Sequence, residues 1–269
     1  MTLEPSGRRS VVRVDGAPGA KTSRALDDEL IVEEPLSIQL DGVLVTTTMR
    51  TPGHDAELAV GFCLTDGLLG GAPILEVRHC DGENVITVDT GCLAPPAAPR
   101  LGNVSSSCGW CGSEQIELLV ERLTPIETAP TPDLDLIAAL PDRVLGGQGL
   151  FARTGAVHAA AAFDADGALL VVREDVGRHN AVDKVVGALA MQGGLEDPTE
   201  PGSSLGLFVS GRASIEMVQK AWAAGFHTLV AVSAPTALAT DAARRAGLVL
   251  AGFVRGASFN IYSPAPDNR

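Results

Sequence analysis

The chain has 269 residues, of which 45% are hydrophobic and 4% aromatic, and it carries a formal net charge of −13. This length suffices for one large domain or two modest ones, and the apolar content excludes a disordered chain. The acidic balance disfavours broad binding to nucleic acid. An anionic ligand would therefore need a local cluster of arginines and backbone amides.

The hydropathy pattern contains no membrane or export segment. No run of 18 apolar residues occurs, so no membrane span is expected. Arg8 and Arg9 near the start are not followed by an apolar signal-peptide core. We therefore expect a cytoplasmic protein, in which the five cysteines are thiols rather than a disulfide framework.

The first part of the chain has the pattern of a small, β-rich α+β domain. Residues 1–26 have little periodicity and are expected to be a flexible leader, and the domain itself is expected over residues 27–103. Its strand-like segments LSIQL and VLVTTTM flank Asp41-Gly42, which is a two-residue hairpin signal. A helix is expected in TPGHDAELAVGFCLTDG, followed by a strand pair around Asp81-Gly82 and a proline-rich boundary segment.

The remaining residues, 104–269, are expected to form a layered α/β domain. A helix with Ser113 as its N-cap should follow the cysteine pair of SSSCGWCG, and a short helix is expected near residues 133–146. From residue 205 onward, apolar strands alternate with helical segments, as in compact βα units. In such a sheet, the functional loops lie beyond the C-terminal ends of the strands.

Several of these strand ends carry residues suited to an anion. Helix N-termini and arginine side chains are common partners of phosphate groups. Arg178, Arg212 and Arg255 all fall in such turns, which indicates a nucleotide or pyrophosphate pocket. The alternative, ordinary surface turns with solvated arginines, stays open. The candidate residues are Arg173, Glu174, Asp175, Arg178, His179, Ser210, Gly211, Arg212, Ser233, Thr236, Arg255, Gly256 and Ser258.

The pair Cys108 and Cys111 in SSSCGWCG has three common uses. A structural zinc site needs a second cysteine pair or histidines, and the chain has one CxxC only. A redox dithiol is the second use. The third is a nucleophilic thiol, favoured by the small neighbours and by a following helix whose positive end lowers a thiol pKa. A nucleophile is the preferred interpretation, while the redox, zinc and purely structural alternatives stay open.

The other cysteines and histidines give weaker signals. His158, in the apolar segment TGAVHAAAAF, is expected to be a satisfied core residue. Cys63, Cys80 and Cys92 match no defensible zinc spacing and are expected to be structural. No metal site is expected.

Seven segments resemble the FdhD family, the sulfur-carrying accessory proteins of formate dehydrogenase, in order and spacing over residues 29–263. They are EEPLSIQLDG, MRTPGHDAELAVGFCLTDGLL, SSSCGWCG, TGAVHAAAAF, REDVGRHNAVDKVVG, SGRASIEMVQKAWAAG and VSAPTALA…GFVRG. The resemblance implies a cytidine-deaminase-like fold for the C-terminal domain. Deamination itself is not expected, because Ala160 stands where zinc deaminases have a glutamate and the CxxC precedes His158.

The resemblance also implies an activity and its residues. It implies a sulfurtransferase that takes persulfide sulfur from a cysteine desulfurase of the IscS type to a molybdenum bis(molybdopterin guanine dinucleotide) cofactor. Cys108 matches the family's persulfide carrier and Cys111 its partner. The family's cofactor-binding segment matches Phe253, Val254, Arg255, Gly256, Ala257 and Ser258, and the loops around Ser210, Gly211, Arg212, Arg178 and His179 would complete the pocket.

The implied partners are the desulfurase, the catalytic subunit of formate dehydrogenase and a second copy of the chain in a homodimer. Neither nucleic acid nor a membrane is expected as a partner. The alternative function is a non-catalytic chaperone that binds and delivers the molybdenum cofactor.

Overall fold

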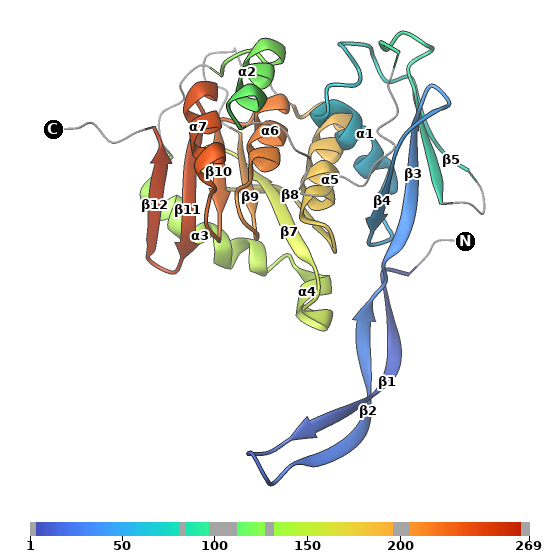
Figure 1. The fold of residues 1–269 in the computed structure, drawn as a ribbon, viewed down its shortest axis with the longest axis vertical. Coiled ribbons are helices and arrows are strands. Elements are labelled where there is room, and N and C mark those ends of the chain that lie inside the picture. Colours follow the sequence, from blue (N-terminus) through green and yellow to red (C-terminus); the bar gives the residue numbers. More distant parts are fainter. Residues whose placement is uncertain (1–3, 81–83, 97–111, 127–131, 196–204, 265–269) are drawn as a thin grey trace, which may run out of the picture.

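The computed structural model describes residues 4–80, 84–96, 112–126, 132–195 and 205–264. In these ranges the chain forms three β-sheets and seven helices (Figure 1). The expected α/β class is confirmed, with a larger C-terminal sheet between helices and a smaller, β-rich N-terminal part. No helix within the described ranges is long and apolar enough to cross a membrane.

The first two strands form a ribbon that projects from the rest of the molecule (Figure 1). β1 (Ser6–Asp15) and β2 (Thr22–Ile31) pair antiparallel along their full lengths of 10 residues each. This corrects the expectation that residues 1–26 have little regular structure. Hydrophobic periodicity did not predict these strands, because most side chains on both faces of the ribbon are exposed to solvent.

A four-stranded sheet follows, with strand order β4-β3-β6-β5 and α1 packed on one face. Asp41 and Gly42 have positive φ angles of 49° and 82°, which makes the tight turn expected between the first two of its strands. The second expected strand pair is also confirmed. The elements are β3 (Glu34–Leu40), β4 (Val43–Arg50), α1 (Asp55–Thr65), β5 (Glu76–His79) and β6 (Val85–Asp89).

The larger sheet has the strand order β12-β11-β10-β9-β7-β8. β9, β10 and β11 are parallel, and β8 runs in the same direction because β8 and β9 are both antiparallel to β7. The C-terminal ends of these four strands therefore share one edge of the sheet. The strands are β7 (His158–Phe163), β8 (Leu169–Asp175), β9 (Gly206–Val209), β10 (Thr228–Ala231), β11 (Val249–Arg255) and β12 (Ser258–Ser263).

Helices cover both faces of this sheet. Ala160 and Ala162 of β7 pack in the core on the side of α5, α6 and α7, whereas Ala159 and Ala161 pack in the core on the side of α3. The strand is therefore apolar on both faces, as in layered α/β proteins. The helices are α2 (Gly112–Arg122), α3 (Leu134–Leu145), α4 (Gly149–Thr154), α5 (Arg178–Met191), α6 (Ile215–Ala223) and α7 (Ala237–Ala246).

Helix α1 lies between the N-terminal sheet and α5 (Figure 1). A Cβ added to Gly61 of α1 would lie 1.8 Å from the carbonyl oxygen of Asp183, and one added to Gly187 of α5 would lie 1.8 Å from that of Glu57. Only glycine allows two helices to cross this closely. The two expected domains are therefore in direct contact. Their expected boundary at residue 103 lies outside the described residues, so the division stays a prediction.

Candidate functional site

The candidate site lies at the edge where β8, β9, β10 and β11 end and where β7 begins. Backbone hydrogen bonds join neighbouring turns at this edge: Ser233 N donates to Gly211 O at 3.3 Å, and Phe253 N donates to Ser233 O at 3.1 Å. His158 and Ser210 lie on the same edge, one at the start of β7 and one at the end of β9. The fold thus brings together turns that are far apart in the sequence.

His158 stands between the start of α5 and the turn at Ser210 and Gly211. Its Nδ1 lies 3.5 Å from Ser210 Oγ, and a Cβ on Gly211 would lie 3.7 Å from that nitrogen and 3.6 Å from Arg178 Cδ. Burial and the charge of Arg178 lower the pKa of His158, against the opposing charge of Asp175. Its neutral ring can donate and accept hydrogen bonds. His158 is half-buried and lines a pocket, so the expected core position is wrong, whereas its Nδ1 does have a partner in Ser210.

Arg178 and His179 open helix α5 at this edge. Among the described residues, the buried atoms Arg178 Nε and His179 Nε2 have no hydrogen-bond partner. Burial and the positive charges of Arg178 and Lys220 lower the pKa of His179 to about 4, against two nearby carboxylates. His179 is therefore neutral at pH 7. Unpaired buried polar atoms are rare in proteins, and these two lie at the start of α5, on the candidate edge.

The predicted cofactor segment, residues 253–258, forms the end of β11, a turn and the start of β12. Phe253 has a positive φ of 56° and is 43% exposed, whereas Val254 is fully buried. The side chain of Val254 packs in the core, so its assignment as a ligand contact is corrected. Arg255 Nε donates to Val232 O at 3.1 Å, which fixes the exposed guanidinium at the edge. Three other predicted residues, Arg212, Ala257 and Ser258, are exposed.

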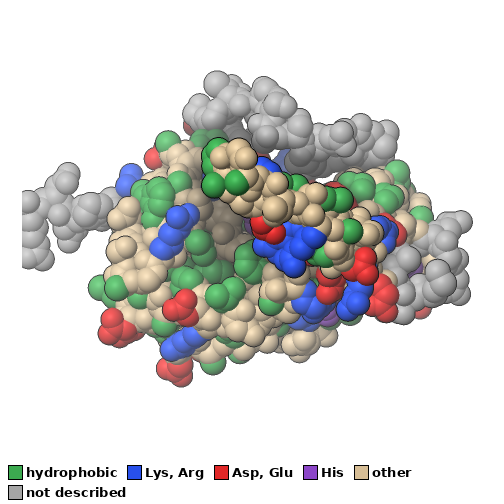
Figure 2. All heavy atoms as spheres, turned by 90° about the horizontal axis from the view of Figure 1, so that it is seen from below, with side chains coloured by type: hydrophobic (Ala, Val, Ile, Leu, Met, Phe, Trp, Pro, Cys, Tyr) green, Lys and Arg blue, Asp and Glu red, His purple; other side chains and the backbone are tan. Residues whose placement is uncertain are grey.

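A pocket of about 520 Å³ opens at the same edge, beside α3 and α4. His158, Ser210, Asp142 and Gln148 contribute polar groups to its wall, and most of the remaining lining is apolar. Cavities of this size and character are typical of small-molecule sites. Figure 2 shows the molecule from this side, with hydrophobic side chains close to Lys and Arg side chains. The apolar lining includes Pro141, Leu145, Phe151, Val157, Val176, Phe208 and Val232.

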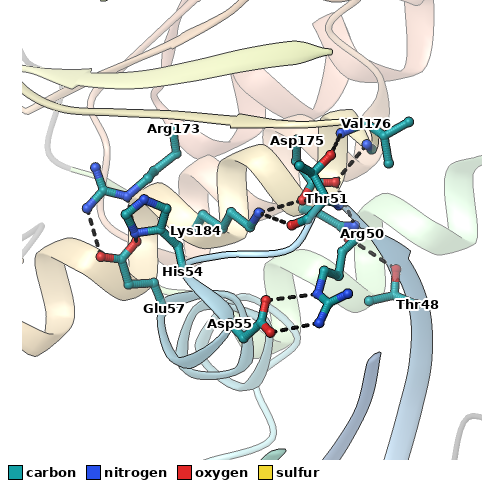
Figure 3. A network of polar contacts seen from close by, with 12 residues as sticks. Thr48, Arg50, Thr51, His54, Asp55, Glu57, Arg173, Asp175, Val176 and Lys184 are labelled. Atoms are coloured by element: carbon teal, nitrogen blue, oxygen red, sulfur yellow. Dashed lines mark hydrogen bonds and ion pairs between the residues drawn. The ribbon is translucent and has the colours of Figure 1, made fainter. Parts of the chain in front are cut away.

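Asp175, predicted to belong to an anion site, instead anchors the connection between β4 and α1 (Figure 3). Its carboxylate forms a fully buried ion pair of 2.6 Å with Lys184. Asp175 Oδ2 also accepts a hydrogen bond from Thr51 N at 3.1 Å, while Val176 N donates to Thr51 Oγ1 and Lys184 Nζ to Thr51 O. Asp175 is thus an internal structural residue rather than a ligand contact.

Arg173 and Glu174 are also paired within the protein. Arg173 donates two hydrogen bonds to Glu57 of α1, at 2.5 and 2.7 Å (Figure 3). Glu174 accepts hydrogen bonds from the N–H groups of Leu150 and Phe151 at the start of α4. Their prediction as anion-site residues is corrected, because these contacts occupy their charged groups.

Cys108 and Cys111 lie outside the described residues, so their roles stay predictions. Helix α2 is described from Gly112 onward, which confirms the helix expected after the cysteine pair in the sequence. The expected N-cap Ser113 falls inside this helix rather than before it. The positive end of a helix next to a thiol lowers its pKa and favours the thiolate.

The other cysteines do not join the site. Burial raises the pKa of the Cys63 thiol to about 12, and Cys63 packs in the core of the N-terminal part as expected. Cys80 and Cys92 are exposed and line a second pocket, of about 530 Å³, on the N-terminal sheet. Within the described ranges, no group of three or more His, Cys, Asp or Glu side chains is placed to hold a metal ion.

The fold and the candidate site define a class: an α/β protein with a candidate site at the shared C-terminal ends of its parallel strands. Comparison with known proteins gives the family. The chain belongs to the FdhD/NarQ family, whose model matches residues 31–267.

Relatives extend over nearly the whole chain. It is 44% identical to the sulfur carrier protein FdhD of Streptomyces avermitilis, covering 95% of this chain and 93% of that one. It is 46% identical to the protein of the same name from Corynebacterium efficiens, covering 88% and 89%. A crystal structure assigned to a formate dehydrogenase accessory protein of Desulfotalea psychrophila aligns with a TM-score of 0.74 at 25% identity, covering 97% of this chain and 98% of that one.

Proposed function

We propose that the protein is a sulfur carrier in the maturation of formate dehydrogenase and that it acts as a sulfurtransferase. The observation that carries this proposal is its similarity, at 44–46% identity, to proteins named sulfur carrier protein FdhD. Its donor is a cysteine desulfurase of the IscS type. Its acceptor is the molybdenum bis(molybdopterin guanine dinucleotide) cofactor of the formate dehydrogenase catalytic subunit, and its location is the cytoplasm.

In this proposal Cys108 carries the sulfur. Its thiolate attacks the outer sulfur of the desulfurase persulfide, and the desulfurase cysteine leaves as a thiolate. Cys108 then holds the sulfur as a persulfide, and Cys111 is the second thiol of the pair. Helix α2, described from Gly112 onward, follows the cysteine pair closely in the sequence, and this supports the role because a helix N-terminus stabilises a nearby thiolate.

The strand edge supports binding of an extended anionic substrate such as this cofactor. From β8 to β11 the edge crosses four strand spacings, or roughly 19 Å at about 4.8 Å each. Arg178 Cδ would lie 3.6 Å from a Cβ on Gly211 after β9, and Arg255 Nε donates to Val232 O after β10, so both arginines bring positive charge to this edge over neighbouring strand ends. Gly211 allows close backbone approach near the middle, and the adjoining apolar pocket suits a ring system.

The carrier role of Cys108 is tested by loading the protein with sulfur. We expect wild type, incubated with a cysteine desulfurase and cysteine, to gain the mass of one sulfur atom on the peptide containing Cys108. Cys108→Ala should gain none, whereas Cys80→Ala, which changes an exposed cysteine of the N-terminal sheet, should load normally. Sulfur on Cys108→Ala at the wild-type level would contradict the assignment.

The ligand site is tested separately with guanosine diphosphate, which needs no sulfur chemistry. We expect Arg255→Ala and Arg178→Ala each to weaken its binding about 10- to 100-fold, because each removes a charged hydrogen-bond donor. Arg245→Ala, at an exposed arginine of α7, is the matched control and should bind as wild type. Calorimetry measures the dissociation constant of guanosine diphosphate for all four proteins, and equal constants would contradict the proposed pocket.

The alternative function, a cofactor chaperone without sulfur chemistry, leads to a different expectation for the cysteine variants. If the protein only binds and delivers the cofactor, the double variant Cys108→Ala, Cys111→Ala should support full formate dehydrogenase activity. We expect this variant to bind guanosine diphosphate normally but to leave formate dehydrogenase inactive.

A further inference from the structure

Thr51 joins the N-terminal part of the chain to the start of α5. It is 1% exposed and lies between the end of β4 and the start of α1. Its N–H donates to Asp175 Oδ2 at 3.1 Å, and its Oγ1 accepts from Val176 N at 3.0 Å (Figure 3). Its carbonyl oxygen accepts from Lys184 Nζ at 2.9 Å. All three polar groups of Thr51 thus bind residues 124 to 133 positions later in the chain.

The connection that carries Thr51 is itself held on the N-terminal side. Arg50, at the end of β4, is 1% exposed and donates two hydrogen bonds to Asp55, the first residue of α1, at 2.9 and 2.8 Å (Figure 3). Pro52 follows Thr51 and disfavours a helical backbone conformation at Thr51. Thr51 is therefore a fixed point on the N-terminal part.

The turn between β8 and α5 depends on this fixed point. Asp175 Oδ1 accepts from Gly177 N at 2.8 Å, while the other oxygen of the same carboxylate binds Thr51 N. Val176, between these two residues, donates its N–H to the Thr51 hydroxyl oxygen. Arg178 follows directly as the first residue of α5. Contacts with Thr51 therefore set the backbone position from which the Arg178 side chain starts.

The Arg178 side chain extends from this turn toward the end of β9. Its Cδ would lie 3.6 Å from a Cβ on Gly211, and its buried Nε has no hydrogen-bond partner among the described residues. Arg173, five positions earlier, is instead fixed by two hydrogen bonds to Glu57. Since no such pair holds Arg178 within the described ranges, the backbone of the turn determines where its guanidinium group lies.

We propose that Thr51 is a positioning residue for ligand binding: through the turn at Val176, it places Arg178 to contact an anionic ligand. Hydrogen bonds between arginine and phosphate require that the guanidinium group be placed to within a fraction of an ångström. The inference rests on the proposed function, because it takes the pocket with Arg178 as given. It adds that the N-terminal part contributes to ligand affinity through Arg178.

The test is a double-mutant cycle between Thr51 and Arg178 in the full-length protein, with guanosine diphosphate as the ligand. Thr51→Val keeps the shape of the side chain and removes the oxygen that accepts from Val176 N. Calorimetry measures the dissociation constants of wild type, both single variants and the double variant, at a temperature at which circular dichroism shows all four to be folded. We expect Thr51→Val to weaken binding about three- to tenfold in wild type, and less than about twofold in Arg178→Ala.

Two further variants separate positioning from a general loosening of the structure. Thr51→Ser retains the hydroxyl group and should bind the nucleotide as wild type does. Thr65→Val makes the matched substitution at another buried threonine, 2% exposed, whose hydroxyl joins α1 to Asp183 of α5 at 2.8 Å. It should lower the urea midpoint of unfolding and leave the dissociation constant unchanged, because Asp183 lies beyond the first turn of α5.

Thr48→Val gives the same test if Thr51→Val does not fold. Thr48 Oγ1, on β4, donates to Asn180 Oδ1 at 3.2 Å, and Asn180 lies in the first turn of α5 with Arg178. Because Thr48 is only partly buried, its loss should disturb folding less. We expect the same pattern as for Thr51→Val, with weaker binding in wild type and no further loss in Arg178→Ala.

The proposal would be overturned if Thr51→Val bound guanosine diphosphate like wild type, or if it weakened binding equally in both backgrounds. An equal loss of affinity in Thr65→Val would also overturn it, because the effect would then be general loosening. These results would leave the proposed pocket intact. If Arg178→Ala itself bound as tightly as wild type, both the pocket and this proposal would be wrong, so the two failures are distinguishable.

Discussion

At the scale of single residues, His179 shows how the fold sets a charge state at the candidate site. In the folded protein, burial and neighbouring positive charges lower its pKa from 6.5 to about 4. The unfolded chain therefore binds a proton at His179 between these pH values, and the folded protein does not. The resulting contribution to the free energy of unfolding is fully present above pH 6.5 and is lost as the pH falls toward 4.

The variant His179→Gln removes this dependence. We expect the stability advantage of wild type over the variant to shrink by roughly 1–3 kcal/mol between pH 7 and pH 4, since the unfolded wild-type chain alone gains the extra proton. Urea unfolding at several pH values, without ligand, measures both proteins. A difference that is constant across this range would show that the pKa of His179 is not lowered.

Residue types alone did not separate ligand contacts from internal pairs at this site. Arg173 and Arg178 are five positions apart in one motif, yet Arg173 binds Glu57, 116 residues away, while Arg178 Nε stays unpaired. His158 is the opposite case: the apolar residues after it indicate a buried strand, so the sequence predicts a core residue rather than a site residue. The feature that indicates a site residue is that His158 is the first residue of this strand, at the candidate edge of the sheet. Both outcomes depend on tertiary neighbours.

At the scale of elements, α5 connects the candidate site to the N-terminal part. Its first turn carries Arg178, and Asn180 Nδ2 in the same turn donates to Met49 O of β4 at 2.7 Å. One face of α5 crosses α1 at Gly187. The N-terminal sheet therefore helps to fix the start of α5, where the unpaired polar atoms lie.

The crossing of α1 and α5 predicts a strong effect of a single methyl group. Gly187→Ala would place a Cβ against the backbone of Glu57, so the helices must separate, at a cost of about 1–3 kcal/mol or more. Gly149→Ala is the control, since the nearest atom to its Cβ would be in the flexible end of the Arg153 side chain, at 3.7 Å. Urea denaturation should give a much larger loss for Gly187→Ala, and equal losses would contradict the close crossing.

Most elements of the two larger sheets could be predicted from local patterns. The Asp41-Gly42 turn and the alternation after residue 205 are signals in adjacent residues, and both are confirmed. β1 and β2 lack such a signal because they have no buried face. β12 was missed because it follows β11 after a two-residue turn that was interpreted as part of a ligand loop.

At the scale of the whole molecule, the buried contacts between α1 and α5 predict that both parts unfold together. Cys63 and Trp222 report on separate cores, since Cys63 packs with the N-terminal sheet and Trp222 with the larger sheet. We expect the urea midpoint for labelling of Cys63, followed by peptide mass, to equal that for Trp222 fluorescence in a Trp110→Phe background. Two separate midpoints would show independently stable domains.

The contact between α1 and α5 also has a consequence for synthesis on the ribosome. Thr65 of α1 hydrogen-bonds Asp183 of α5, 118 residues later in the chain. At about 5–20 residues per second, α1 waits roughly 6–24 s after its own synthesis before this partner exists. During that time the face of α1 around Gly61 is uncovered. A nascent chain that stalls before α5 should therefore be a substrate for chaperones.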